Sequence, residues 1–215
     1  MHAVVLAGSA LLLAACDVPT ATRPTFAYDP TTLSNSKLYR WANGRKLRVW
    51  VDVSDSAASV DIGHAVRLAA QSWNAIPQFA EFELTVVTIR ADAEILVFDR
   101  SRPLPITPGS CTFDARGAVG YTYFCVNGLS AQRLSLSSGA ASGASVVIRV
   151  DRALVTSQTA YNAIVAHELG HALGIGAHSA VSTDVMFGLP TAVRPSARDA
   201  QTLQYVLGAR ADITL

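Results

Sequence analysis

Apolar residues recur along the chain at two spacings, and these spacings predict an alternation of strands and helices. Residues Arg48–Val53 alternate apolar and polar side chains, which is typical of a half-buried strand. Asp61–Ala75 has a helical repeat whose apolar stripe consists of Ile62, Ala65, Val66, Ala69 and Trp73. His64 lies off this stripe, so we expect it at the surface. Further strands are predicted at Leu84–Ile89, Glu94–Phe98, Ala118–Val126 and Val146–Val150.

Two helices are predicted in the last third of the chain. The run Thr159–Ala166 consists of good helix formers, and either Thr156 or Ser157 can cap its first turn. A last helix is expected to begin after Ser196, because Asp199 three residues later completes a pair that resembles a capping box.

The N-terminus predicts export. Residues 4–15 form an apolar stretch that is too short to span a bilayer and has the length of a secretory signal core. It ends Leu-Ala-Ala-Cys, which resembles a bacterial lipoprotein cleavage box with Cys16 as the lipidated residue; an ordinary cleaved signal is the alternative. We therefore expect an exported protein, lipid-anchored in the cell envelope and facing the periplasm or the surface, or else secreted. The predicted organisation is a lipoprotein signal peptide at 1–15, a Pro/Thr/Ser-rich tether at 16–36 and one folded domain at 37–215.

Composition narrows the classes of function. The formal net charge is +1 and 15% of the residues are charged, so we expect no nucleic-acid partner. Roughly 200 residues follow the signal, which is enough for one domain with its own hydrophobic core. We also expect the protein to be a monomer. If Cys16 carries lipid, Cys111 and Cys125 remain as an even pair and are predicted to form a disulfide in an oxidising compartment. Two separate buried thiols are the alternative.

The strongest chemical signal is the segment His-Glu-Leu-Gly-His-Ala-Leu-Gly-Ile-Gly-Ala-His at residues 167–178. On a helix, His167 and His171 lie one turn apart on the same face, so both imidazoles can reach one zinc ion. Glu168 then points beside the metal, where it can act as general base toward a water molecule in the open ligand position. Gly174 can end the helix with a sharp turn that brings His178 back as the third ligand.

This pattern resembles the metzincin zinc endopeptidases, whose signature joins the three histidines to a Met-turn further along the chain. Met186 lies where that methionine is expected. Within the metzincins the chain looks most like the matrixins, the matrix metalloproteinase type, in which a serine follows the third histidine as Ser179 does. Their Met-turn also reads much like Val-Met-Phe at 185–187, and residues 195–208 resemble their last helix. The resemblance extends over residues 37–210 and is strongest at 160–208.

The resemblance implies an α+β fold of the zincin type: a twisted, mixed five-stranded sheet with an active-site helix, a Met-turn and a C-terminal helix. It also implies a zinc-dependent endopeptidase with one catalytic zinc held by His167, His171 and His178. Glu168 is then the catalytic residue that assists the attack of zinc-bound water on a peptide bond.

The resemblance further implies how a protein or peptide substrate is bound. The substrate is expected to add as a strand beside an antiparallel edge strand at Ala118–Phe124, with Tyr121 or Tyr123 facing the cleft. Residues Phe187–Thr191, after the Met-turn, are expected to line the pocket just past the scissile bond. Structural calcium is common in the family, but the sequence contains no clear ligand cluster for it.

The spacing before the third histidine departs from the metzincin pattern. Three residues, Ile175, Gly176 and Ala177, separate Gly174 from His178, where the pattern has two. A bulge at Gly176 can absorb the extra residue, because glycine tolerates unusual backbone conformations. The alternative is a degenerate metzincin that acts as a non-catalytic binding protein in the cell envelope.

Overall fold

The computed structural model describes residues 25–32, 36–42, 45–53, 60–76, 82–99, 118–127, 130–132, 134, 143–155 and 157–215. The predicted signal peptide, the predicted lipidation residue Cys16 and the predicted disulfide partner Cys111 lie outside these residues. Within the described part of the chain, no helix is long and apolar enough to cross a membrane.

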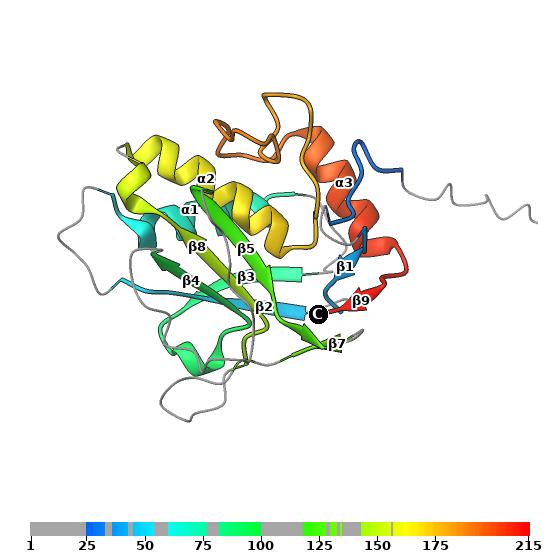
Figure 1. Ribbon diagram of the computed structural model, residues 1–215, viewed down its shortest axis with the longest axis horizontal. Helices are drawn as coiled ribbons and strands as arrows, with labels where there is room; N and C mark the ends of the chain where they lie inside the picture. Colours follow the sequence, from blue (N-terminus) through cyan, green and yellow to red (C-terminus); the bar gives the residue numbers. More distant parts are fainter. Residues whose placement is uncertain are drawn as a thin grey trace, which may run out of the picture.

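A mixed five-stranded sheet forms the centre of the molecule (Figure 1). In spatial order its strands are β3 (Phe82–Val87), β2 (Arg45–Val51), β4 (Ile95–Asp99), β8 (Val146–Val150) and β5 (Gly120–Phe124). The first four are parallel, and β5 runs antiparallel to β8 at the edge of the sheet. The central strands β4 and β8 are almost wholly apolar, as expected of strands covered on both faces.

Three helices accompany the sheet: α1 (Ile62–Asn74), α2 (Gln158–Ala172) and α3 (Ala197–Gly208). Helices α1 and α2 pack against each other on one face of the sheet, α1 over β3 and α2 over β5 and β8 (Figure 1). Each helix begins with a side-chain cap, from Asp61, Ser157 and Ser196 respectively, and the predicted Ser196–Asp199 capping box is present. The short 3-10 helices η1 (Arg90–Asp92) and η2 (Arg152–Leu154) follow β3 and β8. The predicted α+β class with a mixed five-stranded sheet is confirmed.

Two buried tryptophans fix the position of α2. The indole N–H of Trp73, on α1, donates to the carbonyl of Ala166 at 2.8 Å, and that of Trp41 donates to the carbonyl of Ala172 at 2.7 Å. Both rings are fully buried, so each contributes a large apolar contact as well as a satisfied polar group. The middle and the C-terminal end of α2 are thereby held against the core.

A second, smaller sheet was not predicted. It consists of the two-residue strands β1 (Tyr39–Arg40), β9 (Ile213–Thr214), β7 (Ser130–Ala131) and β6 (Val126–Asn127), in that order. The predicted strand Ala118–Val126 is therefore divided at Cys125 between β5 and β6. Strands of two residues carry no periodic pattern, and β1 and β9 lie near opposite ends of the chain.

Residues 25–32, which we assigned to the tether, lie against the folded domain, and we refer to them as the N-terminal strap. The contacts join Phe26 to Tyr205 edge to face, the Ala27 N–H to Thr202 Oγ1 at 3.2 Å and the Tyr28 hydroxyl to Asp199 Oδ1 at 2.6 Å. All three partners belong to α3. The prediction that these residues belong to a tether therefore differs from the structure. The strap packs an aromatic ring against α3 and forms hydrogen bonds with it.

Candidate metal centre

The first two candidate ligands, His167 and His171, lie on the buried helix α2. Its residues are buried on almost every side from Val165 to Ala172. The helix is covered by the sheet and α1 on one side and by the chain that follows it on the other. The i and i+4 positions of His167 and His171 place both rings on the same side, as predicted.

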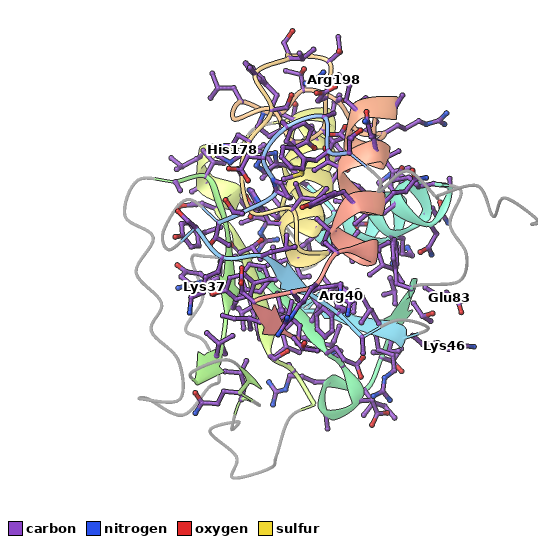
Figure 2. All side chains as sticks on the ribbon, turned by 90° about the vertical axis from the view of Figure 1, so that its right-hand side faces the viewer. Lys37, Arg40, Lys46, Glu83, His178 and Arg198 are labelled. Carbon is purple, nitrogen blue, oxygen red and sulfur yellow. The ribbon has the colours of Figure 1, made fainter. Side chains whose placement is uncertain are left out.

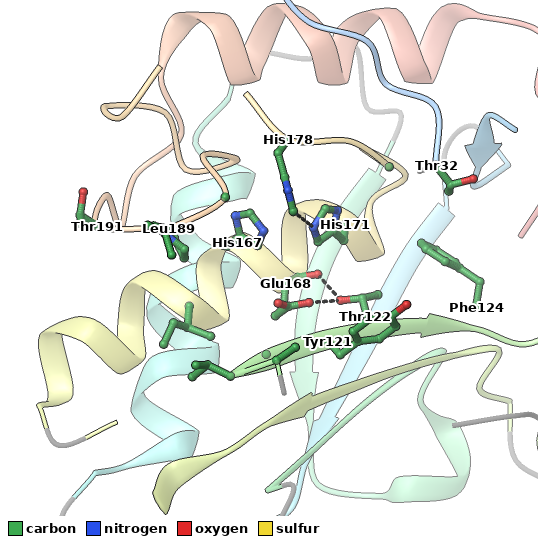
Figure 3. Close-up of a pocket in the computed structure, with 17 residues that line it drawn as sticks. Thr32, Tyr121, Thr122, Phe124, His167, Glu168, His171, His178, Leu189 and Thr191 are labelled. Carbon is green, nitrogen blue, oxygen red and sulfur yellow. Dashed lines mark hydrogen bonds between the residues drawn. The ribbon is translucent and has the colours of Figure 1, made fainter. Parts of the chain in front are cut away.

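The three predicted ligand histidines come together (Figure 3). One ligand nitrogen from each of His167, His171 and His178 lies within 4.8 Å of the others. The Nε2 atoms of His171 and His178 are 3.3 Å apart, and two nitrogens bound to one tetrahedral zinc lie at about the same separation, roughly 3.4 Å. The three side chains therefore form a site that could bind a metal ion.

Two backbone carbonyls orient the histidines of α2. Nδ1 of His167 lies 2.7 Å from the carbonyl oxygen of Val185, and Nδ1 of His171 lies 2.6 Å from that of Ile175. A carbonyl oxygen only accepts hydrogen bonds, so each ring donates from Nδ1–H. Each ring thereby keeps an unprotonated Nε2, which is the form that binds a metal.

Burial keeps the three rings neutral. It lowers the pKa of His167 to about 4 against the opposing effect of the Val185 carbonyl, and it lowers the pKa of His171 well below the ordinary value. Burial also lowers the pKa of His178, which is the most exposed of the three. Neutral imidazoles are ligands at neutral pH without first losing a proton.

The turn after α2 accommodates the extra residue before His178. Gly174 has a φ of +108°, and a Cβ there would lie 2.4 Å from the carbonyl oxygen of Tyr39, so only glycine fits. The N–H of Gly176 donates to the carbonyl of Pro30 in the strap at 2.7 Å. A Cβ on Gly176 would lie 2.5 Å from the backbone nitrogen of Thr32. The additional residue therefore lies against the strap, and His178 still reaches the other two histidines.

The predicted Met-turn lies directly behind the histidines. Met186 is fully buried, and its Sδ is so close to α2 that a Cβ on Gly170 would lie 2.3 Å from it. The backbone N–H of Ser179 donates to the Met186 carbonyl at 2.7 Å, which joins the segment after His178 to the turn. The turn is thus packed under the site by backbone contacts and by close approach to α2.

Asp199 connects the turn, α3 and the strap. Its fully buried carboxylate accepts hydrogen bonds from the N–H groups of Val185 and Met186, from that of Ser196 and from the Tyr28 hydroxyl. Four donors from three separate segments thereby meet on one side chain. This explains why a capping residue of α3 also positions the carbonyl that orients His167.

A second buried carboxylate, Asp184, supports the segment after His178. It accepts hydrogen bonds from the hydroxyls of Ser179 and Ser196 and from Nε of Arg198, which lies 3.0 Å away. Figure 2 shows Arg198 and His178 at the same end of the molecule. Burial alone would raise the pKa of Asp184, but these hydrogen bonds outweigh burial and hold the pKa below its usual range.

We expect Asp184→Asn to lower the free energy of unfolding at pH 7 by about 2–4 kcal/mol, because a buried acceptor of three hydrogen bonds loses its charge. The lowered pKa means that the stabilisation is complete above the unfolded-state value near 4 and is lost as the pH falls through the folded-state value. Urea unfolding at pH 7 and pH 3 measures this. The difference in the free energy of unfolding between wild type and variant should be smaller at pH 3 than at pH 7. An equal difference at both pH values would contradict the role of the ionised carboxylate.

Glu168 lies next to the triad and faces β5. Its side chain is buried, and burial raises its pKa to about 7, although a hydrogen bond from the Thr122 hydroxyl opposes this. The hydroxyl Oγ1 is 2.7 Å from Oε2 of Glu168 (Figure 3). A carboxyl group with a pKa near neutrality can both accept and return a proton.

A pocket of about 820 Å³ opens at the histidines and at Glu168. Its other walls are mostly apolar. They come from β5 with the two residues before it, from α2 and the turn that follows it, from the segment after the Met-turn and from the strap: Ala118–Thr122, Phe124, Ile164, Gly176, Gly188–Thr191 and Thr32. The prediction that Tyr121 or Tyr123 faces the cleft is met by Tyr121, which lines the pocket. Tyr123 follows Tyr121 on the same face of β5, where the two rings are in contact, and packs in the core. The predicted lining Phe187–Thr191 needs one correction, because Phe187 is not among the lining residues.

The remaining predicted site residues are placed as follows. Cys125 is disulfide-bonded, and Cys111, its predicted partner, lies outside the described residues. His64 is exposed on α1, as predicted. Among the described residues, the histidine triad is the one group of three or more histidine, cysteine, aspartate or glutamate side chains that could hold a metal ion.

Sequence reasoning missed Thr122, Asp184 and the role of Asp199 beyond its cap. No motif marks the first two, because their partners are 46 residues away or belong to a loop without periodicity.

Neither a scan against models of known protein families nor a search of curated proteins finds a match for this chain.

Proposed function

We propose that the protein is a zinc-dependent endopeptidase of the metzincin type, similar to the matrixins. The observation that supports this most is that three neutral histidine nitrogens converge beside a buried glutamate in the wall of a largely apolar pocket. Three nitrogen ligands with an open fourth position are typical of catalytic zinc. The Nε2 atoms of His171 and His178 are 3.3 Å apart, which is close to the distance between two nitrogen ligands of one tetrahedral zinc ion.

Zinc bound there would lower the pKa of a water ligand and polarise the scissile carbonyl. His167, His171 and His178 would hold the ion, with the Val185 and Ile175 carbonyls keeping the first two rings in the ligand tautomer. Glu168 takes the proton from the attacking water and passes it to the leaving amine. The Met-turn packs against α2 at Gly170, beside His171 in the sequence of the helix, and supplies the Val185 carbonyl that orients His167.

The edge strand β5 gives the substrate its orientation. It pairs with β8 on one side and ends the five-stranded sheet on the other, alongside the pocket. An extended peptide that adds to this edge would run past Glu168 and the histidines. The wall formed by Gly188–Thr191 would then receive the side chain just past the scissile bond.

Cellular placement is part of the same proposal. We propose that the chain is exported and held in the cell envelope by lipid on Cys16, with secretion as the alternative, and that it acts as a monomer. A disulfide at Cys125 is consistent with an oxidising compartment. The degenerate alternative depended on the extra residue before His178, and that histidine lies within reach of the other two.

Zinc content and peptide cleavage test the proposal together. The full chain is purified, its bound zinc is measured, and hydrolysis of casein and of a quenched peptide library is followed with and without a chelator. We expect one zinc per chain and cleavage that chelation abolishes and added zinc restores. One zinc without cleavage of any peptide would favour the binding-protein alternative, and a folded chain without zinc would contradict the proposal.

A further inference from the structure

Strand β5 presents two unusual positions to α2. Gly120 and Thr122 are two residues apart, so both face the helix that carries Glu168. A Cβ at position 120 would lie 2.6 Å from Oε1 of Glu168 and 2.9 Å from Cγ2 of Ile164. The lack of a side chain at Gly120 therefore leaves the space that the Glu168 carboxylate occupies.

Thr122 fills the next position on the same face with a hydroxyl group. Its Oγ1 lies 2.7 Å from Oε2 and 2.9 Å from the backbone carbonyl oxygen of Glu168 (Figure 3). Within the described part of the chain, Oε1 of Glu168 accepts no hydrogen bond. The two carboxylate oxygens thus have different surroundings: Oε2 is held by the Thr122 hydroxyl, and Oε1 lies against Gly120.

The hydroxyl can keep this contact while Glu168 gains and loses a proton. A threonine hydroxyl has one proton to donate, and the carboxylate oxygen is the nearer and the more strongly accepting of its two partners. When Oε1 carries the proton taken from water, Oε2 remains an acceptor, so the bond from Thr122 persists. The contact therefore directs proton transfer to one oxygen without having to break in the cycle.

We propose that Thr122 is a positioning residue for the general base: its hydroxyl holds Oε2 of Glu168 so that Oε1 takes and returns the proton. This inference rests on the proposed endopeptidase function. A purely structural reading is that the hydroxyl only ties β5 to α2 through the backbone carbonyl of Glu168. The two readings differ in what happens to kcat when the fold and the metal site remain intact.

Thr122→Val removes the hydroxyl and keeps the shape of the side chain. We expect kcat for a quenched peptide to fall about 10–100-fold, because a hydrogen bond to a charged group is lost in the reacting state. KM, zinc per chain and the thermal midpoint should stay close to wild type. Thr122→Ser, which keeps the hydroxyl, should restore most of kcat. Thr85→Val is the matched control, since Thr85 is an exposed strand residue on β3, at the opposite edge of the sheet.

A second variant tests the same carboxylate if Thr122→Val does not fold. Gly120→Ala places a methyl group 2.6 Å from the present position of Oε1, so the carboxylate must shift; kcat should fall at least tenfold while zinc binding is retained. An active wild type with kcat unchanged in Thr122→Val, or in Gly120→Ala, would overturn the inference alone. The inference would also be overturned if kcat of Thr122→Val fell together with its zinc content. The same holds if kcat of Thr122→Ser fell as far as that of Thr122→Val. A wild type that binds zinc and cleaves nothing would overturn the proposed function, and the inference with it.

Discussion

Glu168→Gln is expected to keep one zinc per chain and to lose about 10²–10⁴-fold in the rate of peptide hydrolysis. Glutamine has nearly the same shape and can still accept the hydrogen bond from Thr122, but its amide cannot take a proton from water. None of the atoms that would bind the metal belongs to this side chain. Single-turnover cleavage of a quenched peptide, with zinc measured on the same sample, checks both parts of the expectation.

The control for this variant is Glu168→Ala, which removes the side chain altogether. Both variants should lose activity to a similar extent, because what they share is the missing proton acceptor. A Glu168→Gln enzyme with more than one tenth of the wild-type rate would show that another group accepts the proton. Loss of zinc from both variants would instead indicate that Glu168 supports the metal site rather than the reaction.

His171→Ala is expected to lose zinc binding and, with it, all chelator-sensitive cleavage. Three ligands give way to two, so the fall in affinity should exceed the roughly 10–100-fold that follows loss of an outer-shell partner. His171 is also bonded to the Ile175 carbonyl at the end of α2, so some loss of stability is expected as well. Titration of the metal-free protein with zinc, in competition with a chromogenic chelator, measures the affinity.

His178→Ala tests the ligand whose position the unusual spacing left open. We expect it to weaken zinc binding as much as His171→Ala does, while the fold remains intact because His178 is exposed. His64→Ala is the control, since this histidine is exposed on α1 and is not part of the triad. Full zinc stoichiometry and unchanged affinity in His178→Ala would remove it from the ligand set.

Much of the sheet and all three helices could be predicted from the chain, because local pattern decides them. Residues Val146–Val150 form a strand with the predicted bounds, and Ser157 and Ser196 begin their helices as capping chemistry requires. The histidines of α2 follow from the i, i+4 spacing alone. Their partners Val185 and Ile175 act through backbone carbonyls, which no side-chain pattern reveals.

The parts that sequence reasoning missed depend on contacts between distant segments. The strap reads as a linker by composition, yet Tyr28 reaches Asp199 and Pro30 reaches Gly176. Strand β5 could be placed by resemblance, but which of its side chains meets Glu168 depends on the register with β8, where Thr122 lies opposite Ile148. A shift of one residue would have turned Tyr121 or Tyr123 toward the helix instead.

The contacts of Asp199 also bear on the order in which the chain can fold. The carboxylate binds the Met-turn and also Tyr28, which lies 171 residues before Asp199 in the sequence. Strand β1 likewise pairs with β9, near the other end of the chain. Contacts of such sequence separation form slowly, since most of the chain must first be brought together. Strands β2, β3 and β4 and helix α1 all come from the first half of the chain, whereas the loop that holds His178 gains its support only after α3 is available. We therefore expect the histidine triad to be completed late in folding.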